Sequence, residues 1–410
     1  MTVADPLFDP AVVEDPYPYF AHLLEKDPVH YLEAANTFLV SRFSLIQQVV
    51  ADTTTYSSNS TEFLFVDPEG KPAMRRPLSG EVEVDLPGVV ATADPPDHTR
   101  QRRILGRLLS AGAVARWEPG IAALLDDALG RHIETGFVEW MAEVAEPLPS
   151  VVVSRLLGLP DATAPFLKRL GFASVEQLNG FVSEERAGKL RELVSDLGPV
   201  GEAYGSARNG DGPGPDTVIG ACAEAVLAGE LNDLEAFTIL ILVVSAGTES
   251  TTSLLGTGAR LLAEDFAMQD RLRNEPSLIP TFVEEACRFE PPFRGHYRRV
   301  TRDTVLGGVD IPAGAHVVLV WPAANHDPEL CSNPDRIVVD RPSPRHHVGF
   351  GWGIHLCVGA TLARLEARVT FERLLATTSR FEVDANAGPL THHRSLMIRR
   401  LVELPLLLKP

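Results

Sequence analysis

The sequence has little of several features, and each shortage argues against a class of protein. Only 4 of its 410 residues are cysteines. They lie far apart, without the paired spacing of a zinc finger, which indicates reduced thiols. Positive charge is also scarce, since 37 Lys and Arg against 55 Asp and Glu give a net charge of −18. Nucleic acid and anionic membranes are therefore poor partners for the molecule as a whole.

The sequence also shows no targeting segment, linker or repeat. Its first residues lack the charged and apolar regions of a signal peptide, and we expect no apolar run long enough to span a bilayer. No Ser/Gly-rich linker or repeat divides the chain. We therefore expect a cytoplasmic protein whose residues 1–410 form one large domain, mainly α-helical with a smaller β-rich part. A hydrophobic content of 45% is ample for an enclosed apolar site.

One of the cysteines has an unusual context. Cys357 lies in residues 346–359 (HHVGFGWGIHLCVG), where glycines let the backbone turn sharply and approach a flat ligand. A helical pattern begins directly after Gly359, which would place the thiol at the positive end of a helix dipole, where a thiolate is favoured. The alternative is a small buried hydrophobic residue, the usual role of a lone cysteine.

The spacing around Cys357 resembles the haem-ligand loop of the cytochrome P-450 family. The six matching positions are Phe350, Gly351, Gly353, His355, Cys357 and Gly359. The resemblance implies the cytochrome P-450 fold, noncovalently bound haem b and Cys357 as the thiolate ligand of its iron, with Phe350, Gly351, His355 and Gly359 beside the cofactor. A dinucleotide-binding fingerprint is not supported, because no strand and no third glycine at the required offset accompany Gly351 and Gly353.

A second motif lies in residues 93–103, where His98 and Arg102 stand at i and i+4 on one face of a predicted helix. Two donors on one face suit a carboxylate, although a solvated basic helix is the simpler alternative. The run is similar to a D-P-P-x-H-x-x-x-R segment of cytochrome P-450s, which implies that His98 and Arg102 bind the haem propionates. Arg298 matches a further propionate-binding arginine of the family, just before a β-rich segment.

A long central helix is predicted over about 232–264. It begins with a capping box at Asn232 and Glu235, and its apolar first part predicts burial on all sides. Residues 246–252 (AGTESTT) then combine small residues, which let a flat ligand approach, with an acid and several hydroxyls.

This segment resembles the family's A-G-x-[D/E]-T motif. The resemblance implies that Ala246 and Gly247 border the haem, and that Glu249 and Ser250 guide protons during oxygen activation. Serine replaces the usual threonine at position 250, so Thr251 is a second candidate for the catalytic hydroxyl.

Two further segments carry structural expectations. Glu285 and Arg288 resemble the family's E-x-x-R helix, and Arg341 matches the arginine that this pair binds. The Pro- and Gly-rich residues 56–92 contain apolar islands at 63–66 and 86–90, which are compatible with a substrate-facing lid, and a solvated surface loop is an equal alternative. By resemblance, residues 160–185 and 391–397 are the other walls of a substrate channel.

Together these motifs imply a haem-thiolate monooxygenase. It would insert one oxygen atom from O₂ into a mostly apolar small organic substrate, with electrons from NAD(P)H through a ferredoxin-type donor and its reductase. A local basic cluster of arginines (Arg100, Arg103, Arg107, Arg364 and Arg368) could dock an acidic donor. We expect a monomer.

Two alternatives stay open. The first is a peroxide-dependent or non-oxygenase haem-thiolate enzyme, which Ser250 suggests. The second is a non-catalytic haem protein that binds a ligand, against which Glu249 argues.

Overall fold

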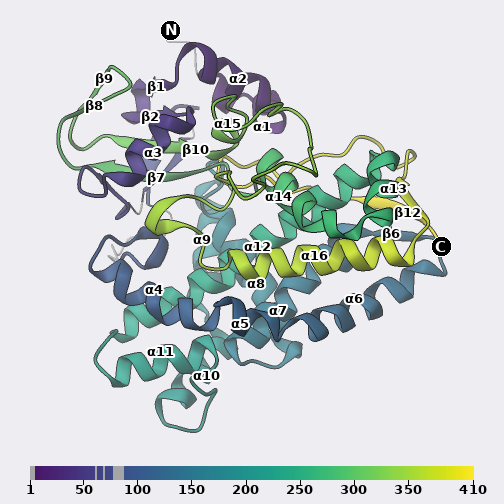
Figure 1. Cartoon of the computed structure of the whole chain (residues 1–410). Coiled ribbons are helices and arrows are strands. Elements are labelled where there is room, and N and C mark those ends of the chain that lie inside the picture. Colours follow the sequence, from purple (N-terminus) through teal and green to yellow (C-terminus); the bar gives the residue numbers. More distant parts are fainter. Residues whose placement is uncertain (1–4, 61, 68–69, 77–86) are drawn as a thin grey trace.

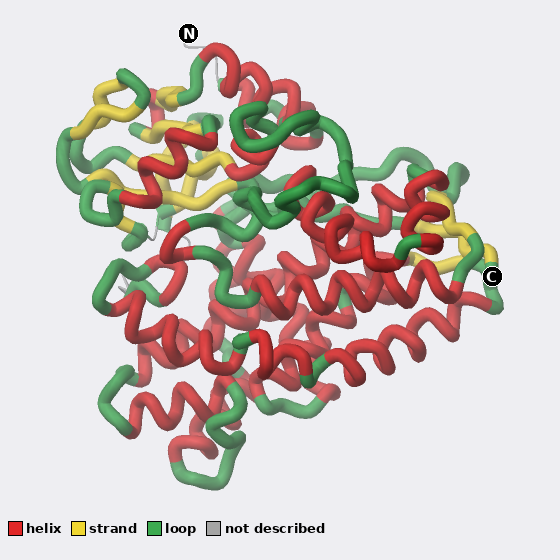
Figure 2. Tube along the Cα trace, viewed as in Figure 1, coloured by secondary structure: helices red, strands yellow, loops and turns green. Residues whose placement is uncertain are grey.

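The computed structural model describes residues 5–60, 62–67, 70–76 and 87–410. Figure 1 shows a β-rich part, which contains the N-terminal segment, beside a larger helical part in which α12 (Asp233–Ala263) and α16 (Ala360–Thr377) run through the middle. The tube in Figure 2 shows most strands gathered in the β-rich part and a smaller group near the C-terminus. The expected fold class, mainly α with a smaller β part, is confirmed.

The main sheet joins strands from distant parts of the sequence, in the order β1-β2-β10-β7-β3. Its central strands β2 and β10 are parallel and buried along their whole length, as expected for strands that read TFLV and HVVLV. The strands of this sheet are β1 (Val29–Leu32), β2 (Thr37–Val40), β3 (Tyr56–Ser57), β7 (Gly295–Val300) and β10 (His316–Val320).

Smaller sheets complete the described β structure. A C-terminal sheet has the order β11-β12-β6, and two hairpins pair β4 with β5 and β8 with β9. Their bounds are β4 (Phe63–Val66), β5 (Pro72–Arg75), β6 (Phe137–Glu139), β8 (Thr304–Leu306), β9 (Val309–Ile311), β11 (Arg380–Val383) and β12 (Pro405–Lys409).

The helices pack mainly around α12. Its neighbours are α7 (Pro147–Leu157), α8 (Ala164–Glu176), α11 (Val218–Leu227), α13 (Phe266–Asn274), α14 (Ile279–Phe289) and α16. The other α-helices of the described residues are α1 (Pro10–Glu14), α2 (Tyr17–Lys26), α3 (Phe43–Ala51), α4 (Asp97–Leu108), α5 (Ala111–Ala115), α6 (Glu118–Ile133), α9 (Glu184–Ser195), α10 (Gly198–Arg208) and α15 (Trp321–Asn325).

The start of α12 is the predicted capping box. The Glu235 N–H donates to Asn232 Oδ1 at 2.9 Å, and the Asn232 N–H donates to Glu235 Oε2 at 2.9 Å. Among the described residues, α12 is also the one helix long and apolar enough to cross a membrane by length and composition. The expectation that no apolar run reaches that length is therefore wrong. Because 61% of the apolar window is buried inside the protein, packing in the core explains its composition.

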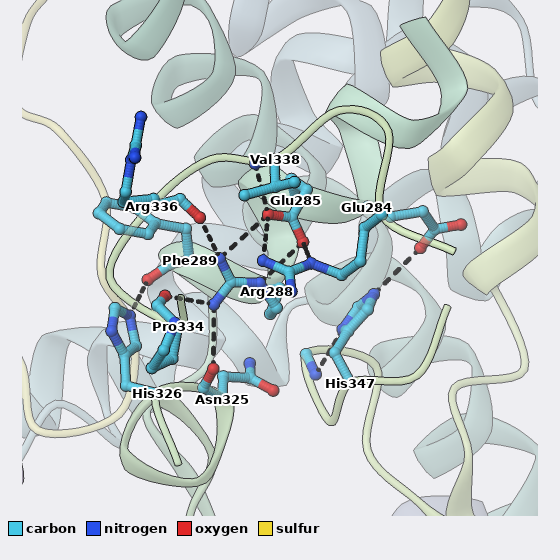
Figure 3. Close-up of polar contacts among 12 residues, drawn as sticks. Glu284, Glu285, Arg288, Phe289, Asn325, His326, Pro334, Arg336, Val338 and His347 are labelled. Carbon is cyan, nitrogen blue, oxygen red and sulfur yellow. Dashed lines mark hydrogen bonds and ion pairs between the residues drawn. The ribbon is translucent and has the colours of Figure 1, made fainter. Parts of the chain in front are cut away.

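A buried ion-pair network joins α14 to the chain that leads into the cysteine loop (Figure 3). Arg288 Nε donates to Glu285 Oε1 at 2.8 Å, and both side chains are fully buried. Arg341 donates to the same carboxylate at 2.8 and 3.1 Å. The expected contact between the E-x-x-R pair and Arg341 is thus confirmed.

Arg288 also fixes the backbone around it. Its Nη1 donates to the carbonyls of Asn325 at 3.0 Å and Pro334 at 2.7 Å, and its Nη2 donates to the Arg336 carbonyl at 2.8 Å. Every charge in this network has a partner, so burial is tolerated only while both signs are present.

We expect Glu285→Ala and Arg288→Ala to lower the free energy of unfolding by about 3–5 kcal/mol, because each leaves an opposite charge buried without its partner. Urea unfolding followed by circular dichroism measures the change. Arg336→Ala is the matched control, since the exposed Arg336 gives the network only its backbone carbonyl. Equal unfolding free energies for all of these variants would contradict the importance of the network.

Candidate active site

Cys357 lies in a tight loop between a short 3₁₀ turn, Gly353–His355, and the first residue of α16. Its N–H donates to the Phe350 carbonyl at 2.8 Å, which closes the loop on itself. Gly351 and Gly353 have φ values of 75° and 70°, a region that glycine enters without strain. The two glycines therefore form the sharp turns that the sequence predicts.

The thiol of Cys357 has surroundings suited to a thiolate. The residue is exposed to a solvent probe, yet burial among protein atoms raises the pKa of its thiol. The side chain is therefore accessible although many protein atoms lie around it. The N–H groups of Gly359 and Ala360 and the charges of Arg102 and Arg364 oppose the effect of burial and lower this pKa.

Basic side chains from α4 and β7 surround His355, two residues before Cys357. The rings of His98 and His355 have centroids 4.3 Å apart, and Arg102 Nη2 donates to the Leu356 carbonyl at 2.6 Å. Burial, followed by the charges of Arg298, His98, His296 and Arg102, lowers the pKa of His355 to about 3. The structure therefore brings His98, Arg102 and Arg298, which the resemblance assigned to the haem propionates, together with His355 of the cysteine loop.

The polar atoms of this cluster fit a haem. Both ring nitrogens of His98 and Nδ1 of His355 are buried and make no hydrogen bond with the described residues. Burial lowers the pKa of Arg298 to about 10, and the charge of Asp94 opposes this shift. An unpaired buried polar group costs about 1–3 kcal/mol, so a ligand with carboxylates would satisfy these donors.

Residues that orient His355 were not identified from the sequence. Ser58 Oγ lies 2.8 Å from His355 Nε2, and Asp94 Oδ1 accepts the Ser58 N–H at 2.8 Å. Asp94 also accepts the hydroxyl of Ser57. The aspartate of the Asp-Pro-Pro run was the available signal, but its partner Ser58 lies 36 residues away.

The structure also places His296 near Arg298 and His355. Its Nδ1 accepts a hydrogen bond from Trp321 Nε1 at 2.7 Å. Burial and the nearby charge of Arg298 lower the pKa of His296 to about 4. The ring is therefore neutral at pH 7, with the proton on Nε2.

Gly247 of α12 also lies at a contact between two helices. A Cβ atom at Gly247 would lie 2.7 Å from Val153 Cγ2, so this glycine allows α12 to approach α7 closely. The need for glycine arises from helix packing. Contacts of Ala246 and Gly247 with the cofactor stay a prediction.

Glu249 is buried in α12 and only half paired. Its Oε1 accepts a hydrogen bond from Arg400 Nε at 3.3 Å, while its buried Oε2 has no partner among the described residues. Burial raises the pKa of Glu249 to about 7, although the charge of Arg400 opposes this shift. The carboxyl group can therefore both hold and release a proton near neutral pH.

Arg400, which the sequence did not reveal as a site residue, connects Glu249 to the surface. Its Nη1 donates to Glu146 Oε1 at 3.0 Å, and Lys168 Nζ donates to Glu146 Oε2 at 3.1 Å. The guanidinium of Arg400 lies 4.4 Å from the centre of the Phe172 ring. This chain of ion pairs leads from a buried acid to a partly exposed lysine.

The two candidate hydroxyls differ in their surroundings. Ser250 is partly exposed, whereas Thr251 is buried. Ser250 Oγ donates to the Ala246 carbonyl at 2.5 Å, which leaves its lone pairs free to accept a hydrogen bond. Ser250 is therefore the more accessible of the two candidates.

The segments expected to border the substrate meet on one side of the molecule. The Val66 N–H, at the end of β4, donates to the Gly180 carbonyl at 2.8 Å, and the Leu396 N–H donates to the Asn179 carbonyl at 2.7 Å. A Cβ at Gly180 would lie 2.6 Å from Leu396 Cδ1. Residues 77–86 of the predicted lid, including Leu86 of its second apolar island, lie outside the described residues.

Comparisons with known proteins agree with this geometry. A family model described as cytochrome P450 matches residues 221–402. The chain is 34% identical over 406 residues to cytochrome P450 144 of Mycobacterium tuberculosis, covering 98% of this chain and 91% of the relative. It is 30% identical over 412 residues to vitamin D(3) 25-hydroxylase of Pseudonocardia autotrophica, covering 98% and 96%. The crystal structure of CalO2 superposes with a TM-score of 0.87 at 26% identity, covering 100% of both chains.

We expect His98→Ala to speed haem loss by roughly 10- to 150-fold, because a hydrogen bond to a charged group contributes about 1.5–3 kcal/mol. Transfer of haem to apomyoglobin measures the rate. His22→Ala, at an exposed histidine of α2, should leave the rate unchanged. A His98→Ala rate equal to that of the control would remove His98 from the cofactor site.

Proposed function

This chain belongs to the cytochrome P450 family, and we propose that it inserts one oxygen atom from O₂ into a mostly apolar small organic substrate. It is a P450 monooxygenase, an oxidoreductase that uses haem. This membership argues against the non-catalytic alternative, since a relative over nearly the whole chain is named as a hydroxylase. The haem supplies O₂ binding and reductive activation, which thiolate ligation favours.

One observation carries the assignment of the site. Cys357 lies just before α16, beside buried ring nitrogens of His98 and His355 that have no hydrogen-bond partner among the described residues. Cys357 is the proposed iron ligand, and His98, Arg102, Arg298 and His355 are the proposed propionate contacts. Ala246, Gly247, Phe350, Gly351 and Gly359 are proposed to border the macrocycle.

The proposed substrate is apolar because of the side chains that border its space. Leu242 and Val243 are partly exposed although α12 lies in the protein interior. Leu178 and Leu396, from segments proposed to line the substrate channel, are also partly exposed. Water makes few hydrogen bonds with such side chains, so its displacement by an apolar molecule would lower the free energy.

Protons are proposed to reach the site through Glu249 and Ser250. Glu249 lies between a surface-linked ion-pair chain and the interior, and its free Oε2 is available to donate when the group is protonated. Ser250 can accept that proton at its lone pairs. Thr251 is the second candidate, less favoured because it is buried.

The electron donor is proposed to be a ferredoxin served by an NAD(P)H-dependent reductase. The sequence carries no flavin or nicotinamide fingerprint, which supports an external donor. The basic cluster offers less free charge than expected, because Arg100 pairs with Glu235 at 2.7 Å, Arg103 with Glu230 at 3.1 Å and Arg368 with Glu118 at 2.7 Å. A cytoplasmic location and a monomeric state belong to the same proposal.

A peroxide-dependent reaction is the second candidate. Its support is the hydrogen bond that Ser250 donates to Ala246 in its own helix, because a hydroxyl held there could be a weaker proton relay than the usual threonine. Faster turnover with hydrogen peroxide than with ferredoxin, reductase and NAD(P)H would favour this candidate.

We expect Glu249→Gln to slow product formation with the donor system while leaving the substrate-induced spin shift and the reduced CO spectrum intact. Wild-type turnover should fall as pH rises through about 7, because Glu249, with its pKa near 7, then loses the proton it must donate. The variant should lack this limb of the pH profile.

The matched control for this experiment is Glu264→Gln, at the exposed C-terminal end of α12, which should keep the wild-type pH profile. Ser250→Ala should lower the product formed per NAD(P)H consumed, and Thr251→Ala should not. An unchanged pH profile in Glu249→Gln together with silent Ser250→Ala and Thr251→Ala variants would exclude proton relay through α12.

A further inference from the structure

Two consecutive acids of α14 bind different parts of the chain. Successive side chains point about 100° apart around a helix, and Figure 3 shows the Glu284 and Glu285 carboxylates turned away from each other. Glu285 binds the chain before the cysteine loop through Arg341. Glu284 instead binds the loop itself and the helix after it, and no motif in the sequence pointed to this role.

Glu284 is 4% exposed and has a dense set of partners. Arg364, in the second turn of α16, donates from Nε and Nη2 to its two oxygens at 2.7 and 3.1 Å. His347 Nε2 lies 3.1 Å from Oε2, and exposed Arg345 adds a contact at 3.3 Å. One carboxylate thus joins residues on both sides of Cys357.

The His347 side of this arrangement fixes the first half of the loop. His347 Nδ1 accepts the Gly349 N–H at 3.0 Å, so the proton is on Nε2, where it is donated to Glu284. A Cβ at Gly349 would lie 2.5 Å from the Cys287 carbonyl. The loop therefore lies directly against α14 at this point.

The Arg364 side packs against the loop residue that binds the Cys357 N–H. The guanidinium carbon of Arg364 lies 4.4 Å from the centre of the Phe350 ring, and the Phe350 carbonyl accepts the Cys357 N–H. A positive charge near a ligating thiolate reduces its electron donation to iron and favours the reduced state of the metal.

We propose that Glu284 and Arg364 are a positioning pair whose opposite charges set the reduction potential of the haem held by Cys357. The inference rests on the proposed role of Cys357 as the iron ligand. Removing the negative charge should raise the potential, because Arg364 then acts on the thiolate without compensation. Removing the positive charge should lower the potential for the converse reason.

A purely structural role gives a different pattern. If the pair only held the loop in place, breaking it from either side would disturb the loop in the same way. Both single variants would then shift the potential in the same direction, or shift only stability. Opposite signs therefore distinguish the electrostatic role from the structural one.

The test is a spectroelectrochemical titration of the ferric/ferrous couple in the haem-loaded wild type, Glu284→Gln, Arg364→Gln and the double variant. We expect a rise for Glu284→Gln, a fall for Arg364→Gln and a value near that of the wild type for the double variant. Arg364→Lys, which keeps the charge without the two-point contact, should stay close to the wild type.

Arg368→Gln is the matched control. Arg368 lies one turn further along α16 and pairs with Glu118 at 2.7 Å and Glu372 at 2.9 Å, so its removal should leave the potential unchanged. Shifts of the same sign in both single variants, or a shift in Arg368→Gln as large as that in Arg364→Gln, would overturn the proposal. If Glu284→Gln does not accumulate, the comparison of Arg364→Gln with Arg364→Lys decides, and equal potentials overturn it.

Failure of this proposal is distinguishable from failure of the proposed iron ligand. The reduced CO spectrum of each variant is recorded before its titration. A wild-type spectrum without the red-shifted band of thiolate ligation would remove the role of Cys357 itself. A normal band with unchanged potentials would remove only the pair.

Discussion

The pairing of buried charges between α14 and the chain around the cysteine loop is the interaction on which the site depends. A loop rich in glycine loses much conformational freedom when it is fixed. Hydrophobic contacts are not directional, so they alone do not select one conformation of the loop. The fully buried pair Glu285 and Arg288 makes directional contacts instead. Glu285 pairs with Arg341, and Arg288 donates hydrogen bonds to three backbone carbonyls. The cost of burying these charges is offset only in one geometry, so the chain that leads into the loop has one position relative to α14.

Polar groups near the proposed cofactor differ from those of the α14 network, because several of their atoms lack a hydrogen-bond partner among the described residues. His98, His355 and Glu249 each keep a buried atom without a partner among the described residues, whereas the α14 network pairs its charges almost completely. Native proteins rarely leave such atoms unsatisfied in the interior. Their position around Cys357 and along the middle of α12 indicates that a bound group completes the site.

The sequence predicted those parts of the site whose residues lie close together in the chain. The spacing around Cys357, the pair His98 and Arg102 and the cap at Asn232 each specify a local geometry, and the structure contains all three. Residues whose partners lie far along the chain were missed. Ser58 meets His355 across 297 residues, Arg400 meets Glu249 across 151 and Arg364 meets Glu284 across 80, and no local period encodes such contacts. The close approach of Gly247 to Val153 on α7 was missed for the same reason.

Ligation of the haem iron by the Cys357 thiolate is tested most directly by the absorption spectrum of the reduced protein under CO. The wild type should show the strongly red-shifted Soret band of thiolate ligation, and Cys331→Ser, at a partly exposed cysteine away from the site, should show it too. Cys357→His should lose the band, because imidazole is a neutral donor. Retention of the band in Cys357→His would contradict the assignment.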